Sequence, residues 1–187
     1  FLNEEGFKPV YGQVYDKLPG DYSGGMEVWA IDEEGNIIGK VLIDEEGMKV
    51  SRLKSIFNHN LNANVFGSLY KKDKKIAISL YKTYLKSLCN ILNKIGINVN
   101  TIPVLDVSRN NTHSIIGERS FSKEVKIVKY LGNITINECY AKNIVSVVKH
   151  IPGHGCSTKD SHLTLPKVNL NKNILNKIDF YPFKSTQ

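Results

Sequence analysis

Residues 144–166 constrain the fold more than any other part of the sequence. They begin with the apolar run IVSVV at 144–148, which is typical of a strand buried on both faces. Lys149 and His150 follow directly, and the segment PGHG at 152–155 cannot continue regular structure. In parallel α/β proteins, active sites lie at the carboxyl ends of strands and on the loops that follow them. The sequence therefore predicts a functional site at the end of this strand.

The same loop carries Asp160 and His162, which are separated by one residue. In an extended segment, side chains two positions apart lie on the same side, so the carboxylate can accept a hydrogen bond from the imidazole Nδ1–H. This contact raises the basicity of the imidazole and suits a general acid/base near neutral pH. On the residues alone, a chance ion pair in a surface loop remains the other interpretation.

A metal site is a further alternative for this loop. The possible ligands are His150, His154, Cys156, Asp160 and His162. Their spacing matches no standard zinc pattern, and the glycines on both sides of His154 favour a loop over a rigid cage. We therefore predict neither a metal nor a cofactor.

Strand and helix patterns alternate along most of the chain. In helix 71–95, apolar residues recur every four positions from Ile76 to Leu92, and Gly96 ends the helix. This order predicts an α/β fold with a mainly parallel sheet. The expected elements are a strand at 41–43, the helix at 71–95, a strand at 97–104, a helix at 122–141, the strand at 144–148 and a helix at 170–178.

Residues 1–40 contain turn signals and a possible β-hairpin over 28–41, but no motif that assigns them a role. We expect them to form a separate N-terminal segment, followed by one domain at 41–187. The chain starts with Phe1 rather than Met, so the sequence leaves open a removed signal peptide.

The net charge of +7 and the pI near 9.2 raise the alternative of a nucleic-acid-binding protein. Only residues 71–75 form a dense basic cluster, however, and it lacks interleaved aromatic side chains for base stacking. We expect this cluster to be the solvated start of a helix, with no nucleic acid as partner.

The three cysteines are odd in number, widely spaced and form no CxxC pair. This usage favours reduced thiols in the cytoplasm over a disulfide framework, and Cys89 and Cys139 fall in helical patterns as small core residues. No run of about eighteen apolar residues is present, so we predict no membrane span.

Four motifs together carry a family resemblance. The sequences KHIPGHG at 149–155 and DSH at 160–162 resemble the KHFPGHG…DSH signature of family 3 glycoside hydrolases, in the bacterial β-N-acetylglucosaminidase (NagZ-type) branch. NTIPVLDV at 100–107, IGERSF at 116–121 and IDEEGMKVSRL at 43–53 are similar to three further motifs of that family, in the same order.

The resemblance implies a TIM-like (β/α) barrel and a retaining β-N-acetylhexosaminidase that acts, without a cofactor, on N-acetylglucosamine-containing muropeptides or glycosides in cell-wall recycling. His162, held by Asp160, would be the general acid/base. Asp106 would either support the site or cap the turn that follows it. The residues that would bind substrate are Asp44, Arg52, Arg119, Lys149 and His150.

Two departures from the family pattern bear on these expectations. Met48 and Lys49 stand where the family has glycine and arginine, so we expect an altered turn after Asp44. The family's nucleophilic aspartate lies well downstream of the DSH loop, and no Asp of this sequence matches it.

At 187 residues the chain is also short for a closed barrel, which typically needs about 250. We therefore expect a partial barrel, truncated on its C-terminal side, that is inactive alone and is completed by a complementary C-terminal barrel fragment. The alternative is a sugar-binding pseudoenzyme.

Overall fold

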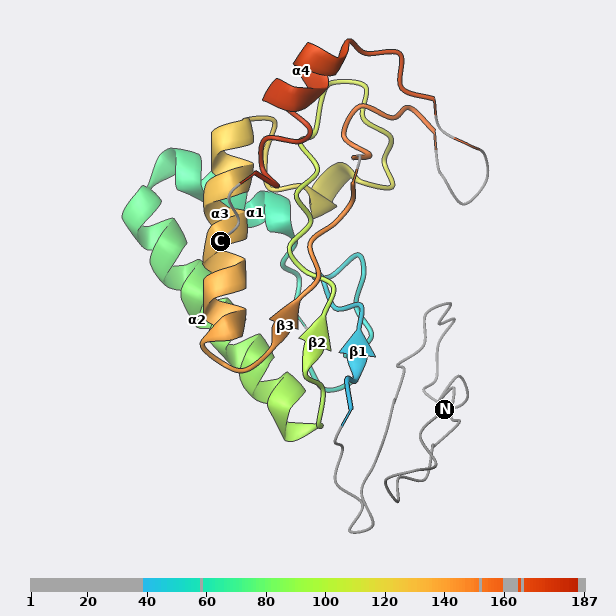
Figure 1. Ribbon diagram of the computed structural model, residues 1–187. Coiled ribbons are helices and arrows are strands. Elements are labelled where there is room, and N and C mark those ends of the chain that lie inside the picture. The colour runs from blue at the N-terminus through green and yellow to red at the C-terminus, as the bar shows by residue number, and fades with distance from the viewer. Residues whose placement is uncertain (1–38, 58, 152, 160–164, 166, 185–187) are drawn as a thin grey trace, which may run out of the picture.

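The computed structural model describes residues 39–57, 59–151, 153–159, 165 and 167–184 (Figure 1). The predicted hairpin at 28–41 lies almost entirely outside these residues. The division of the chain at residue 40 therefore stays a prediction.

The sheet consists of three short parallel strands in the order β1-β2-β3 (Figure 1). They are β1 (Leu42–Ile43), β2 (Val99–Asn100) and β3 (Val145–Ser146). The register pairs Leu42 with Val99 and Val99 with Val145. This confirms the predicted parallel sheet.

The strands are shorter than predicted, although pairing resumes beyond β2. The predicted strand at 97–104 is interrupted near Pro103, whose nitrogen carries no hydrogen to donate to the sheet. Val104 then forms an isolated parallel bridge with Lys149, and the Leu105 N–H donates to the Lys149 carbonyl at 2.6 Å. The backbones after β2 and β3 therefore stay adjacent up to the polar residues.

Four α-helices and one short 3₁₀ helix complete the described fold. They are α1 (Ala63–Lys72), α2 (Lys74–Lys94), η1 (Gly117–Arg119), α3 (Val125–Tyr140) and α4 (Lys172–Lys177). The predicted helices at 122–141 and 170–178 are confirmed with shorter bounds. Within the described residues, no helix combines the length and the apolar content that a membrane span requires.

The prediction for helix 71–95 was wrong at its N-terminal end. Asp73 separates α1 from α2, and its side chain accepts a hydrogen bond from the Ile76 N–H at 3.0 Å as the N-cap of α2. The basic cluster at 71–75 therefore spans the junction of two helices, and all of it is exposed.

The prediction of which residues form the buried apolar face of this helix was also wrong in its first two turns. Ile76 and Leu80 are each 51% exposed, whereas the residues that follow them, Ala77 and Tyr81, are buried. A repeat of four residues advances 400° around a helix with 100° per residue, so a strict repeat of four drifts off any one face.

The core lies between the strands and helices α2 and α3, which run side by side (Figure 1). Leu85 and Leu88 of α2 and Leu131 of α3 are fully buried, and the Tyr81 hydroxyl is 2.7 Å from Thr135 Oγ1 across the two helices. Cys89 and Cys139 are buried in the same core, as predicted.

Strand β3 is buried on one face only, which corrects the prediction for residues 144–148. Ile144 is 2% exposed and packs in the core, but Val145 and Val147 are 49% and 39% exposed. Because successive side chains of a strand point to opposite faces, Val145 and Val147 lie on the face away from the core. In the described part of the chain that face stays open.

Gly67→Ala in α1 tests the packing of this helix. A Cβ at this position would lie 1.7 Å from the carbonyl oxygen of Phe121. Gly→Ala inside a helix ordinarily stabilises a protein by about 1 kcal/mol, but this contact reverses the sign. We expect a loss of about 1–3 kcal/mol in the free energy of unfolding, measured by urea denaturation. Ser68→Ala at the exposed neighbouring position is the control, and an unchanged Gly67→Ala would contradict this packing.

Candidate active site

Residues from the ends of all three strands meet in one hydrogen-bonded cluster. Asp44 follows β1 and Thr101 follows β2, while Lys149 lies just beyond β3. Lys149 Nζ donates to Asp44 Oδ1 at 2.5 Å and to Thr101 Oγ1 at 2.8 Å, and the Thr101 hydroxyl also donates to Asp44 Oδ1, at 2.5 Å. The carboxyl edge of the sheet therefore presents a preformed polar surface.

The charge of Lys149 changes the titration of Asp44. Burial alone would raise the pKa of Asp44, but the hydrogen bond and the positive charge of Lys149, with the Thr101 hydrogen bond, lower it below the ordinary value of 3.8. Asp44 is thus held as a carboxylate. Its side chain remains 34% exposed, and both described contacts use Oδ1.

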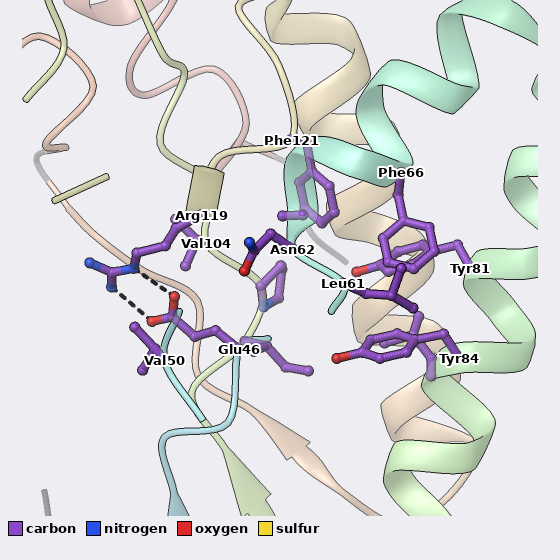
Figure 2. Close-up of a pocket in the computed structure, with 14 residues that line it drawn as sticks. Glu46, Val50, Leu61, Asn62, Phe66, Tyr81, Tyr84, Val104, Arg119 and Phe121 are labelled. Carbon is purple, nitrogen blue, oxygen red and sulfur yellow. Dashed lines mark hydrogen bonds and ion pairs between the residues drawn. The ribbon is translucent and has the colours of Figure 1, made fainter. Parts of the chain in front are cut away.

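A second carboxylate, Glu46, holds two cationic side chains at once. Its Oε2 accepts from Arg119 Nε at 2.7 Å and its Oε1 accepts from Arg119 Nη2 at 2.8 Å (Figure 2). The same Oε1 lies 2.5 Å from Lys149 Nζ. Burial alone would lower the pKa of Arg119, but the contact with Glu46 and the nearby carboxylates of Asp44 and Asp106 raise it. Arg119 therefore stays charged although it is largely buried.

A third carboxylate, Asp106, orients His150. Asp106 is fully buried, and its Oδ2 lies 2.6 Å from His150 Nδ1. This contact places the imidazole proton on Nδ1 and leaves Nε2 as an acceptor, 3.4 Å from Arg119 Nη2. Asp106 Oδ1 also accepts from the His154 backbone N–H at 2.5 Å. Asp106 therefore supports His150 and the turn at His154, and none of its described side-chain contacts caps the turn that follows Asp106 itself.

Arg52 is placed by a loop that is built around Glu45. The Glu45 carboxylate is completely buried and accepts from Ser51 Oγ at 3.0 Å and from the Arg52 backbone N–H at 2.6 Å. Burial raises the pKa of Glu45, and these hydrogen bonds oppose the shift.

The turn after Asp44, where Met48 and Lys49 differ from the family pattern, is closed by hydrogen bonds. The Glu46 N–H donates to the Val50 carbonyl at 2.8 Å, and Lys49 Nζ donates to the Ser114 carbonyl.

All five residues predicted to bind substrate line one cleft of about 450 Å³, together with Lys49 and His154. This volume falls in the range of small-molecule sites. A separate cavity on the other side of the Glu46–Arg119 pair is lined by Phe66, Tyr81 and Tyr84 (Figure 2). At about 20 Å³ it has room for about one water molecule, so it is not a sugar site.

The predicted acid/base pair, Asp160 and His162, lies outside the described residues, so its role stays a prediction. The start of its loop is described and is held in place. The His113 N–H donates to the Ser157 carbonyl at 3.0 Å, and the Thr112 hydroxyl donates to the Gly155 carbonyl. Within the described residues, no group of three or more His, Cys, Asp or Glu side chains could hold a metal ion.

Sequence reasoning missed Glu46 and Thr101. Glu46 lies two positions after Asp44, so a strand-like period would place both carboxylates on the same side of the segment. Thr101 directly follows β2, as Asp44 follows β1, and the rule that polar residues gather at strand ends could have found it.

Asp44→Asn is expected to lower stability at neutral pH but not in acid. A carboxyl group whose folded pKa is lowered stabilises the fold above its unfolded pKa, and this contribution disappears as the pH falls through the folded pKa. Urea denaturation should therefore separate wild type from Asp44→Asn at pH 7, and the gap should close progressively below about pH 4. Asp73→Asn is the control, because it removes an exposed charge and keeps the side-chain oxygen that caps α2. A gap that widens in acid would show that the Lys149 contact does not stabilise the Asp44 carboxylate.

Comparisons with known proteins agree with this geometry. Residues 35–186 match the glycosyl hydrolase family 3 N-terminal domain. The chain is 35% identical over 145 residues to the β-hexosaminidase A of Pseudoalteromonas piscicida. The matched segment covers 76% of this chain and 24% of that protein. It is 27% identical over 144 residues to the β-hexosaminidase of Nitrosomonas eutropha, covering 77% and 41%.

Solved structures show the same fold. Native NagZ from Neisseria gonorrhoeae superposes with a TM-score of 0.72 at 30% identity, over 77% of this chain and 42% of that one. Its complex with N-trifluoroacetyl-D-glucosamine gives a TM-score of 0.73 at 30% identity, over 79% and 43%. The chain thus spans less than half the length of these relatives, and its α/β fold is that of a partial TIM-like barrel. It belongs to glycosyl hydrolase family 3, and residues 35–186 match the N-terminal domain of that family.

Proposed function

We propose that this chain supplies the N-acetylglucosamine-binding part of a retaining β-N-acetylhexosaminidase. The observation that carries the proposal is the convergence of Asp44, Arg52, Arg119, Lys149 and His150 on one cleft at the carboxyl ends of the strands. Two further findings support it. Relatives are named β-hexosaminidases, and a structural neighbour was solved with an N-acylated glucosamine.

The cleft has the chemistry that hydroxyl recognition requires. The exposed part of the Asp44 carboxylate accepts hydrogen bonds from adjacent sugar hydroxyls, while Arg119 donates to hydroxyl oxygens. Lys149 donates to a sugar hydroxyl when that hydroxyl replaces Thr101 among its three acceptors. His150, with its proton on the Asp106 side, accepts from a hydroxyl at Nε2. Because each of these side chains is already held by a partner, little side-chain ordering remains to be done on binding.

For the chemical step we assign His162 as general acid/base and Asp160 as its partner, on the match of DSH to the family signature. His162 protonates the glycosidic oxygen in the first step and takes a proton from water in the second. A retaining mechanism also needs a nucleophilic carboxylate at the anomeric carbon. Glu46 and Asp106 are engaged by Arg119, Lys149 and His150, and Asp44 is assigned to sugar hydroxyls. In the family that the sequence resembles, the nucleophilic aspartate lies well downstream of the DSH loop. We therefore place the nucleophile on a complementary C-terminal part of the barrel.

The proposal extends to substrate source and compartment. We place the substrate among the N-acetylglucosamine-containing muropeptides of cell-wall recycling, and the protein in the cytoplasm. The family resemblance supports the first assignment. The free thiols of Cys89, Cys139 and Cys156 support the second, since disulfides are rare in that compartment. No cofactor is part of the proposed reaction.

Binding of N-acetylglucosamine to the chain is the first test, followed by isothermal titration calorimetry or by NMR chemical shifts. Lys149→Ala should weaken binding by at least about tenfold, because it removes a charged hydrogen-bond donor from the cleft. Lys86→Ala, at an exposed position on α2, is the matched control and should bind as wild type does. Absence of binding by the wild type, or equal binding by Lys149→Ala, would contradict the proposed site.

Hydrolysis of p-nitrophenyl N-acetyl-β-glucosaminide distinguishes an enzyme part from a pseudoenzyme. The chain alone is expected to show no turnover. Addition of the complementary part of the barrel should restore turnover, and His162→Ala should abolish it. Turnover by the chain alone that His162→Ala abolishes would disprove the placement of the nucleophile elsewhere. Sugar binding without turnover in the completed barrel would favour the pseudoenzyme.

A further inference from the structure

We propose that Glu46 is a positioning residue, which fixes Lys149 and Arg119 in the orientation that sugar binding needs without touching the sugar. The inference rests on the proposed function and goes beyond it, because that function assigns roles to Asp44 and Arg52 and none to Glu46, which lies between them in the sequence.

The position of Glu46 relative to the cleft supports an indirect role. Lys149 and Arg119 line the cleft of about 450 Å³, whereas Glu46 is absent from its lining and is only 5% exposed. Glu46 instead lines the small cavity beside Phe66 and Tyr81 (Figure 2). The carboxylate therefore contacts the two cations from outside the cleft.

The contacts of Glu46 fix both cations in direction as well as in place. Arg119 is bound through Nε and Nη2, which is a two-point contact that sets the plane of the guanidinium. Its Nη1 donates to the Ile115 carbonyl at 3.0 Å. Of the three acceptors of Lys149, Glu46 is the one that also binds Arg119. A single carboxylate thus sets the relative geometry of two donors, Arg119 and Lys149, which lie 30 residues apart in the sequence.

Electrostatics gives the same result. Lys149 and Arg119 are each largely buried and share Glu46 Oε1, so their positive charges lie close together and are only partly hydrated. Without the carboxylate between them they would repel each other, and each would have to move toward solvent to recover hydration. The donors would then leave the positions that a sugar hydroxyl meets.

Glu46→Gln tests this role because it keeps the shape of the side chain while removing its charge and turning one acceptor into a donor. We expect the affinity for N-acetylglucosamine to fall about tenfold, with the circular dichroism and the NMR spectrum of the folded protein retained. Glu138→Gln is the matched control. It also removes a Glu–Lys ion pair, with Lys82 at 2.8 Å, but on a helix away from the cleft, and it should leave the affinity unchanged.

A double-mutant cycle separates positioning from a general loss of structure. If Glu46 acts through Lys149, Glu46→Gln should weaken binding less in the Lys149→Ala background than in wild type. Equal effects in both backgrounds would contradict coupling through Lys149. Glu46→Asp provides a second test if Glu46→Gln does not fold. It keeps the charge but shortens the reach, so we expect an affinity below wild type, and a wild-type affinity would overturn the inference.

Failure of the inference differs from failure of the proposed function. If the wild-type chain does not bind N-acetylglucosamine, the proposed function is wrong. If the wild type binds and Lys149→Ala loses binding, but folded Glu46→Gln binds as wild type does, the proposed function stands and Glu46 is not a positioning residue.

Discussion

The described site depends on the hydrogen bonds and ion pairs of the Lys149 ammonium group. An ammonium has three hydrogens to donate, and here they meet three acceptors, on Asp44, Glu46 and Thr101. Asp44 and Glu46 follow β1, Thr101 follows β2, and Lys149 itself follows β3. Each strand has only two residues in regular pairing, and this shared charge adds side-chain contacts to the backbone hydrogen bonds that join the strand ends. The network that we propose for substrate binding is thus also part of what holds the sheet edge in place.

The arrangement of the site followed from the sequence because it needs only strand ends and their polar neighbours. Apolar β-branched runs followed by Asp44 or Lys149 place those side chains at one sheet edge whatever the exact strand length, and the structure brings all five predicted substrate-binding residues to one cleft. The supporting carboxylates were harder to foresee. Glu45 and Glu46 are adjacent, yet one holds a backbone loop and the other holds Arg119. Only the course of the chain after β1 decides which of them does which.

The errors in the fold prediction have both local and long-range origins. Asp73 resembles an ordinary helix residue in a lysine-rich stretch, and its role as a cap becomes visible only where the chain turns between α1 and α2. The burial of β3 was overestimated because an apolar run reports what a strand faces in the complete barrel. Val145 and Val147 remain exposed among the described residues. A hydrophobic sequence therefore predicts the surroundings of a strand in the whole fold, whereas the exposed fractions of Val145 and Val147 refer to this chain alone.

That difference links assembly to function. In a closed barrel, the face of β3 that carries Val145 and Val147 points to the interior, and the same row of alternate residues leads to Lys149. A segment that covered these valines would come to lie beside the cleft, because the apolar face and the polar site are consecutive layers of one surface. Completion of the core and completion of the site would then be a single event. A sugar bound preferentially to the completed site would also stabilise the assembled barrel, since a ligand shifts any equilibrium toward the state that binds it better.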